Sequence, residues 1–473
     1  MKKIIGQLLI PAAALATLLM VDLAPGHPEV TRMAAVAILM AGWWITEAIP
    51  IPITSLLPIA LFPLLGILDG RTTAATYFNH LIFLFIGGFL FAIAMQRWDL
   101  HRRIALRILR FLGSLPTRVL LGFMCSTWFL SMWISNTAAT MMMVPMAIAI
   151  IGPFREHLDK QEARRFSIVL VLGVAYAASI GGISTLIGTP PNMSLARILE
   201  LNFPDMEELT FAGWFRFAFP LSLTFMLTAW FTLSKIARLS GINASIDKNY
   251  FHQQYQQLGK VTYEQRAIGG LFLLLIFGWM FRSEWSQLFP HPKYIDDGTV
   301  AIIVAILLFL IPSKKNPGGK LMDWAAAKEI RWGIILMFGG GFALATGFIE
   351  SGLSESLGEQ LTSLQNVPLW MLITIICTVI TFLTELTSNM ATTEVVLPIL
   401  AAMAKAIGVN PLVLMIPATL SASCAFMLPV ATAPNAIAFG AGEIKIKDMI
   451  RYGFILNIIG IVLISAAAQL LYI

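Results

Sequence analysis

Charged residues and cysteines are both scarce in this chain. Asp, Glu, Lys and Arg together make up 12% of its 473 residues, whereas about 25% is usual for a soluble domain. The three cysteines, Cys125, Cys377 and Cys424, are scattered through apolar segments, which argues against a disulfide framework or a cysteine metal site. The sequence also lacks a phosphate-binding P-loop, a His-Glu metal motif and a nucleophile–base set. These absences argue against an enzyme.

Apolar residues dominate what remains. They account for 58% of the chain, and runs of ~20 apolar residues, each long enough to cross a bilayer core of ~30 Å, recur along its length. The pattern is typical of an all-α polytopic membrane protein. The formal net charge of +6 comes from basic residues in loops between the apolar runs, so it indicates membrane orientation rather than nucleic-acid binding.

The apolar pattern predicts about eleven transmembrane helices and two longer regions. The helices are expected at 5–24, 33–49, 53–68, 80–97, 166–187, 215–236, 265–281, 296–312, 331–349, 412–430 and 452–471. The regions 118–151 and 369–404 are too long for one span, and each follows an amphipathic connector, at 98–114 and 351–365. Each long region is therefore expected to fold back on itself.

The same short polar motif occurs in both long regions. The first copy is Ser135-Asn136-Thr137 and the second is Ser388-Asn389-Met390, so the two asparagines are 253 positions apart (389 − 136). Pro145 and Pro398 follow at the same offset. Because uncharged polar clusters are costly inside a bilayer, a duplicated one is a binding-site candidate. The common offset predicts an internal repeat.

Flanking charge sets the orientation of the two long regions. Basic residues flank 118–151 on both sides, whereas acidic residues precede 369–404. Since Lys and Arg favour the cytoplasmic side, the two regions are expected to be re-entrant hairpins that enter from inside and outside respectively, as in inverted-topology repeats. Counting spans then places the N-terminus in the cytoplasm and the C-terminus outside.

The repeat divides the chain into four predicted parts. These are an N-terminal helix at 1–32, a first inverted repeat at 33–240, a cytoplasmic linker at 241–264 and a second inverted repeat at 265–473. Each repeat contains one of the hairpins.

A hairpin tip in mid-membrane ends one half-helix and begins another. The carbonyl groups at the end of the first favour a small cation, and the free N–H groups at the start of the second favour an anion. The stretches Gly188-Thr189-Pro190-Pro191-Asn192 and Ala431-Thr432-Ala433-Pro434-Asn435 are a second pair of helix breaks, because proline removes a helix donor. No Lys or Arg occurs in these four stretches, so a bound anion is expected to meet helix N-termini, hydroxyls, amides and co-bound cations rather than a guanidinium.

With these four motifs the whole chain resembles the divalent anion/sodium symporter family, which includes bacterial dicarboxylate and mammalian citrate transporters. The resemblance implies a homodimeric elevator-type transporter of the bacterial inner membrane, with scaffold and transport domains, in contact with membrane lipid. It implies sodium-coupled symport of a C4-dicarboxylate such as succinate, malate or fumarate. A sodium-independent dicarboxylate or tricarboxylate exchanger and a sulfate carrier remain alternatives.

The resemblance also implies site residues. At least two Na⁺ sites are expected, the first at Ser131, Ser135, Asn136 and Gly188 and the second at Thr384, Thr387, Asn389 and Ala431. The substrate is expected between Ser135, Asn136, Thr137, Thr189, Pro190, Ser388, Asn389 and Thr432. Two residues depart from the family pattern: Met390 stands where Thr is usual and Ala433 where Pro is common. Both belong to the second half of the site, so they put the substrate's identity in question.

Overall fold

The computed structural model describes residues 2–112, 114–156, 158–242 and 249–472. In this part of the chain the backbone is helical, and an isolated bridge between Pro312 and Lys320 is its only β-type pairing. Of the predicted linker 241–264, residues 243–248 lie outside the described residues. An all-helical architecture is what the sequence predicts.

The N-terminal part of the chain forms six helices, of which α6 is the last. Its helices are α1 (Lys2–Met20), α2 (Pro28–Thr46), α3 (Ile51–Thr54), α4 (Leu57–Leu65), α5 (Gly70–Thr76) and α6 (His80–Arg97). The single span predicted at 53–68 stays a prediction: a two-residue turn at 55–56 separates α3 from α4 within one apolar stretch, Ile51–Leu65. Pro58 has no N–H to donate to the preceding turn, and the carbonyl of Ser55 instead accepts a hydrogen bond from the Tyr77 hydroxyl at 2.5 Å.

The remainder of the first repeat contains the first helical hairpin. Its helices are α7 (Leu100–Leu112), α8 (Pro116–Ser131), α9 (Asn136–Arg155), α10 (Lys160–Gly182), α11 (Pro190–Asn202) and α12 (Phe211–Ile236). The amphipathic connector predicted at 98–114 is α7, and the region predicted at 118–151 is the pair α8 and α9. Helix α11 is not among the helices that the sequence predicts, because its opening prolines indicate a helix break.

The second repeat has the matching order. Helix α13 (Tyr250–Gln257) lies in the predicted linker. The helices that follow are α14 (Tyr263–Met280), α15 (Arg282–Trp285), α16 (Asp297–Leu310), α17 (Trp324–Ala327), α18 (Trp332–Glu350), α19 (Leu353–Leu361), α20 (Leu369–Thr384), α21 (Asn389–Ile407), α22 (Leu412–Ala422), α23 (Ala433–Gly440) and α24 (Ile446–Tyr472). The second hairpin is α20 and α21. Helix α22 ends at Ala422, well before the predicted 430, and α23 resumes after the break.

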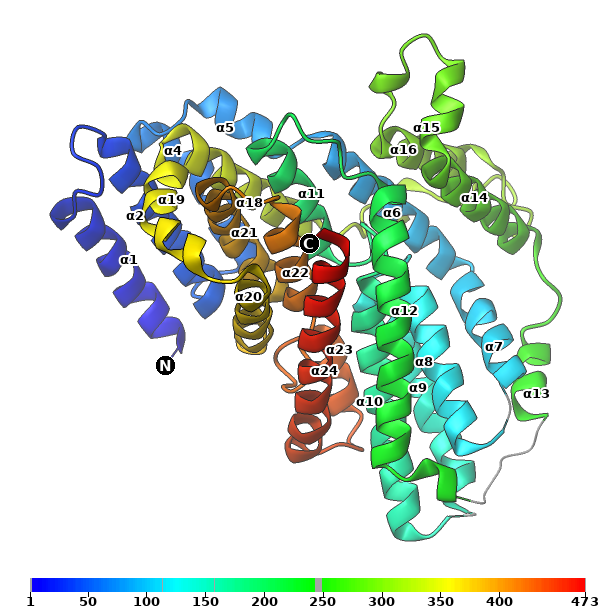
Figure 1. Ribbon diagram of the computed structural model, residues 1–473. Helices are drawn as coiled ribbons and strands as arrows, with labels where there is room; N and C mark the ends of the chain where they lie inside the picture. The colour runs from blue at the N-terminus through cyan, green and yellow to red at the C-terminus, as the bar shows by residue number, and fades with distance from the viewer. Residues whose placement is uncertain (1, 113, 157, 243–248, 473) are drawn as a thin grey trace.

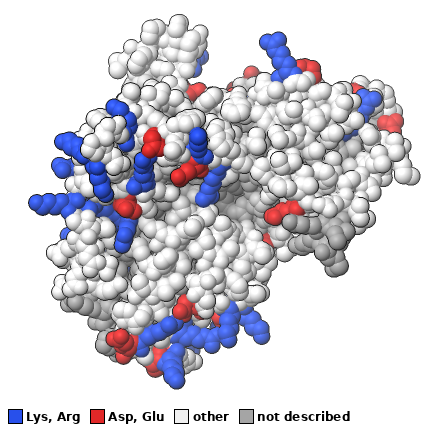
Figure 2. Space-filling view, turned by 180° about the vertical axis from the view of Figure 1, so that it is seen from behind, with Lys and Arg blue, Asp and Glu red and all other residues white. Residues whose placement is uncertain are grey.

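Several of these helices suit a membrane. In the described chain, seven are long and apolar enough to cross one, or eight if the bent segment from Tyr263 to Leu288 counts as one span. Large apolar side chains lie on the outside, with Leu64 80% exposed. On the face seen in Figure 2, charged side chains gather in a few groups separated by uncharged surface. The predicted count of eleven spans stays a prediction.

The two repeats exchange their short helices. Helix α10 packs against both arms of the first hairpin, and α22 packs against both arms of the second. Helix α11 of the first repeat packs against α21 and α22 of the second, while α23 of the second repeat packs against α9 and α10 of the first. Figure 1 shows this central group beside α12 and α24, with α1 and α2 at one end of the molecule and α14 and α16 at the other. The exchange brings the ends of four broken helices together.

Helix α18 packs closely against α21 at Gly341. A Cβ atom at Gly341 would lie 1.9 Å from Oε2 of Glu394 on α21. Glu394 is fully buried, and its Oε1 atom accepts a hydrogen bond from the hydroxyl of Ser194 on α11. The missing side chain at Gly341 is what allows three helices to meet here, since interiors are close-packed.

We expect Gly341→Ala to destabilise the protein, because the added methyl group overlaps the Glu394 carboxyl and overpacking costs ~1–3 kcal/mol. Thermal unfolding of the detergent-purified protein measures the effect. Gly270→Ala is the matched control, because a Cβ there meets nothing within 4 Å. A melting temperature of Gly341→Ala equal to that of the control would contradict this account of the contact.

Candidate functional site

A cavity of about 290 Å³ lies where the exchanged helices meet. It is lined by all eight residues that the sequence predicted for the substrate: Ser135, Asn136, Thr137, Thr189, Pro190, Ser388, Asn389 and Thr432. Of the residues predicted for sodium, Gly188 and Ala431 also line it, while Ser131, Thr384 and Thr387 are buried behind it. The structure thus brings together the predicted residues of both repeats.

Four helices begin at this cavity. Their N-cap residues are Ser135 for α9, Thr189 for α11, Ser388 for α21 and Thr432 for α23, all with extended backbone. Ser135 accepts a hydrogen bond from the N–H of Ala138 at 3.3 Å. The first N–H groups of a helix have no partner within it and carry partial positive charge. Four such ends around one cavity favour an anion.

The amide of Asn136 lies among oxygen atoms. In one orientation its Nδ2 atom donates to Ser131 Oγ at 2.6 Å and to the carbonyl oxygens of Ala178 and Gly188 at 3.2 Å each. In the other orientation Oδ1 takes that place and accepts from Ser131. The amide nitrogen suits this place when no cation is bound, and the amide oxygen suits it when a cation is bound. With Oδ1 inward, four oxygens converge as ligands of a hard cation do.

The second repeat has a related cluster. Thr384 lies 253 positions after Ser131 (384 − 131). Its hydroxyl oxygen lies 2.8 Å from Asn389 Oδ1 and 2.9 Å from the carbonyl oxygen of Ala422, so its one proton is shared between two acceptors. Thr387 does not join this cluster through its hydroxyl, which contacts Thr392 at 2.6 Å and the carbonyl of Leu383 at 2.9 Å. In the described chain no three His, Cys, Asp or Glu side chains gather as a metal site.

Two asparagines brace the helix breaks. Asn192 donates through Nδ2 to the carbonyls of Gly182, Ile183 and Thr185, at 2.8–3.3 Å. Asn435, which is 243 positions later (435 − 192), donates to the carbonyls of Ala425 and Leu428 at 3.0 Å. Both asparagines are fully buried. Because these carbonyls have lost their helical partners, the amides supply the hydrogen bonds that the break removes.

The carboxylate of Glu385 stabilises the second helix break, between α22 and α23. It accepts hydrogen bonds from the backbone N–H groups of Phe426, Met427 and Leu428 at 2.7–3.0 Å and from the Asn457 amide at 2.8 Å. The equivalent position in the first repeat, 253 residues earlier, is Met132 (385 − 253). There the carbonyl of Met132 accepts from Thr185 at 2.6 Å. The second break is thus held by an acid and the first by a hydroxyl.

Sequence reasoning missed the opposite wall of the cavity. It consists of Phe85 and Phe89 on α6 and of Arg331, Ile334 and Met337 at the start of α18. Arg331 therefore lines a site where no Lys or Arg was expected. The spacing of three residues from 331 to 337 puts these side chains on one helical face, which was the available signal.

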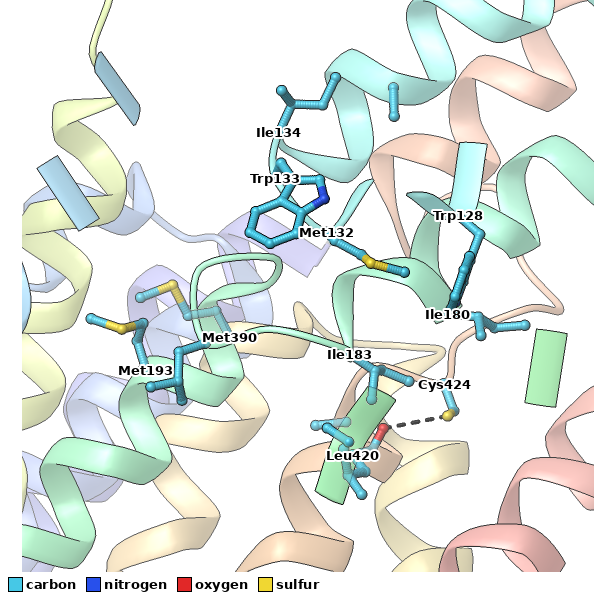
Figure 3. Packing of buried hydrophobic residues seen from close by; sticks show 14 of the residues in the cluster. Trp128, Met132, Trp133, Ile134, Ile180, Ile183, Met193, Met390, Leu420 and Cys424 are labelled. Carbon is cyan, nitrogen blue, oxygen red and sulfur yellow. Dashed lines mark hydrogen bonds between the residues drawn. The ribbon is translucent and has the colours of Figure 1, made fainter. Parts of the chain in front are cut away.

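The two departures from the motif pattern differ in exposure. Met390 is buried, with 6% of its surface exposed, whereas Ala433 is exposed. Both line the cavity. Figure 3 shows Met390 at the start of α21 and Met132, Trp133 and Ile134 in the turn between α8 and α9. The apolar thioether of Met390 therefore lines the cavity at a position where the usual Thr would present a hydroxyl group.

The chain is similar to proteins of known name. Residues 2–472 match the family described as "Sodium:sulfate symporter transmembrane region". The "Sodium-dependent dicarboxylate transporter SdcS" of Staphylococcus saprophyticus is 42% identical, and that of Staphylococcus aureus strain NCTC 8325 is 43% identical. Each alignment covers 98% of this chain and 90% of the relative.

Two solved structures share the fold. The YdaH transporter of Alcanivorax borkumensis superposes with a TM-score of 0.59 at 13% identity, over 88% of each chain. MtrF of Neisseria gonorrhoeae, described as belonging to a class of antimetabolite efflux pumps, superposes with a TM-score of 0.58 at 12% identity, over 98% of this chain and 97% of its own. These named relatives are transporters rather than enzymes. Because the family match runs through nearly the entire sequence, the chain belongs to the divalent anion/sodium symporter family, as its four motifs predicted.

Proposed function

We propose that this protein is a secondary transporter that imports a C4-dicarboxylate, such as succinate, malate or fumarate, together with sodium. The observation that carries the proposal is the convergence of four helix N-termini on one cavity, with an oxygen cluster behind each hairpin tip. The relatives named sodium-dependent dicarboxylate transporters support the same substrate and coupling ion.

Each part of the site has a role in this proposal. The carboxylates bind the N-termini of α9, α11, α21 and α23 through Ser135, Thr189, Ser388 and Thr432 and their neighbours. One sodium ion binds Ser131, Ser135, Asn136 and Gly188, and another binds Thr384, Thr387, Asn389 and Ala431. For Thr387 the backbone carbonyl is the ligand, because the hydroxyl is engaged with Thr392.

Co-transported sodium offsets the membrane potential, which opposes the entry of a dianion. Moving one charge through ~100 mV is worth ~2.3 kcal/mol, so a dianion that enters a negative-inside cell alone faces an opposing ~4.6 kcal/mol. Two sodium ions cancel the charge, and a third makes entry electrogenic. Cations beside the anion also raise its affinity, and this coupling is reciprocal.

The two walls of the cavity support movement of the site as a unit. The wall from α6 and α18 is mostly apolar, while the hairpin tips and helix breaks are polar. Sliding along an apolar wall breaks few hydrogen bonds. We therefore propose an elevator in which the two hairpins, α10–α12 and α22–α24, form the transport domain and move against a scaffold of α1–α6, α14, α16 and α18. The assembly is a lipid-embedded homodimer in the bacterial inner membrane, with its N-terminus in the cytoplasm.

In proteoliposomes with an inward sodium gradient, we expect radiolabelled succinate to accumulate several-fold over the level in choline, because the gradient drives the anion uphill. Unlabelled malate and fumarate are expected to compete. Uptake that is indifferent to sodium and needs a preloaded counter-substrate would replace the proposal with an exchanger. Competition by sulfate alone would indicate a sulfate carrier.

We expect Asn136→Ala and Asn389→Ala each to lower sodium-driven succinate uptake by at least about tenfold, the effect of losing roughly one charge-assisted hydrogen bond. Asn366→Ala, on an exposed position, is the control. Uptake is normalised to folded protein by size-exclusion chromatography. Normal transport by both cavity variants would show that the asparagines only cap helices.

Glu385→Gln is expected to raise the sodium concentration for half-maximal uptake by about tenfold, since charge-assisted hydrogen bonds are worth ~1.5–3 kcal/mol. The amide replaces one acceptor oxygen by a donor that faces backbone N–H groups. The succinate KM at saturating sodium is expected to change far less. The control is Glu359→Gln on the exposed surface of α19. An unchanged sodium response would exclude a positioning role for Glu385.

A further inference from the structure

Arg331 is a charged residue without a partner at the cavity. Among the described residues that line the cavity it alone carries a charge. Its side chain is exposed, and within the described chain it forms no ion pair and donates no hydrogen bond. Arg97, by contrast, is paired with Asp323 at 2.6 Å. An unpaired guanidinium beside an anion site is free to bind a carboxylate.

Arg331 connects the cavity wall to a basic segment of the chain. It precedes α18 and ends a segment, 313–331, that contains four lysines: Lys314, Lys315, Lys320 and Lys328. This segment is tied to the end of α6 by the Arg97–Asp323 ion pair and by the hydrogen bond from Trp98 Nε1 to the carbonyl of Leu321 at 2.8 Å. Concentrated Lys and Arg indicate the cytoplasmic side. Because Arg331 lines the cavity and ends this basic segment, we assign this end of the cavity to the cytoplasmic side.

Arg331 also belongs to a different wall from the rest of the anion-binding groups. The helix N-termini come from α9, α11, α21 and α23, whereas Arg331 comes from α18, alongside Ile334 and Met337. If the site moves relative to α18, its distance to the guanidinium changes, while its distances to the four N-termini do not. The attraction from Arg331 is then present on one side of the membrane only.

We propose that Arg331 is a selectivity residue at the cytoplasmic mouth, where its guanidinium binds one carboxylate of a dicarboxylate whose other carboxylate meets the helix N-termini. The inference rests on the proposed function. Guanidinium and carboxylate match in geometry, with two parallel N–H···O hydrogen bonds. A monocarboxylate fills only one of the two positions, so Arg331 favours dianions. It does so from the cytoplasmic face, which gives internal substrate a higher affinity than external substrate and lets it slow further uptake.

The test compares the two faces of the full-length protein in right-side-out and inside-out membrane vesicles at saturating sodium. Arg331→Gln is expected to raise the succinate KM at the cytoplasmic face by about tenfold, the size of effect that a charge-assisted hydrogen bond has. The KM at the external face is expected to stay within about twofold, because there the guanidinium is out of reach. Arg331→Lys should recover part of the cytoplasmic affinity, since it restores charge without the bidentate geometry. Lys328→Gln, in the same basic segment but outside the cavity, is the matched control and should change neither value.

A second readout separates recognition from folding. Inhibition by succinate and by its monoamide, succinamate, is compared at the cytoplasmic face, and the preference for succinate is expected to shrink in Arg331→Gln while the external preference is kept. Equal changes at both faces, or an unchanged cytoplasmic KM and preference, would overturn the inference. Wild-type vesicles without sodium-dependent succinate uptake would instead contradict the proposed function, and the inference with it.

Discussion

Backbone polar groups inside a membrane must find partners within the protein, and this constraint organises the whole centre of the molecule. Each helix break leaves carbonyl and N–H groups that water cannot reach. The buried amides of Asn192 and Asn435 take up carbonyls on one side of each break, and Glu385 takes up N–H groups at the second. The groups left over are the N-termini and oxygen clusters that face the cavity. The candidate binding site consists of the hydrogen-bonding groups that the fold itself leaves without partners.

The exchange of short helices makes that capacity converge. If α11 packed only within its own repeat, its N-terminus and that of α21 would have no reason to meet. Because α11 packs against α21 and α23 packs against α9, each half of the cavity is closed by both repeats. A substitution in either hairpin therefore acts on groups from both halves of the sequence.

Much of this arrangement could be predicted from the sequence, because apolar run length, proline and repeated letters are local signals. The pairing of Asn136 with Asn389 and the bounds of α6 follow directly from them. Other features depend on distant contacts. The hydroxyl of Tyr77 reaches the carbonyl of Ser55, at the turn between α3 and α4. Arg331 reaches the cavity only because α18 packs beside the hairpins. The three-residue spacing from Arg331 to Met337 predicts a shared helical face, but it does not indicate what that face lines.

The Glu385 carboxylate at the second helix break affects the relative free energies of the two end states in the proposed transport cycle. In an alternating-access transporter built from inverted repeats, exchanging the roles of the two copies converts one end state into the other. Identical copies would give two end states of equal free energy, populated equally at rest. Glu385 accepts four hydrogen bonds where its counterpart Met132 offers only a thioether side chain. In the elevator cycle proposed above the two copies would therefore not be interchangeable, and the empty molecule would prefer one side of the membrane before any ion gradient acts on it.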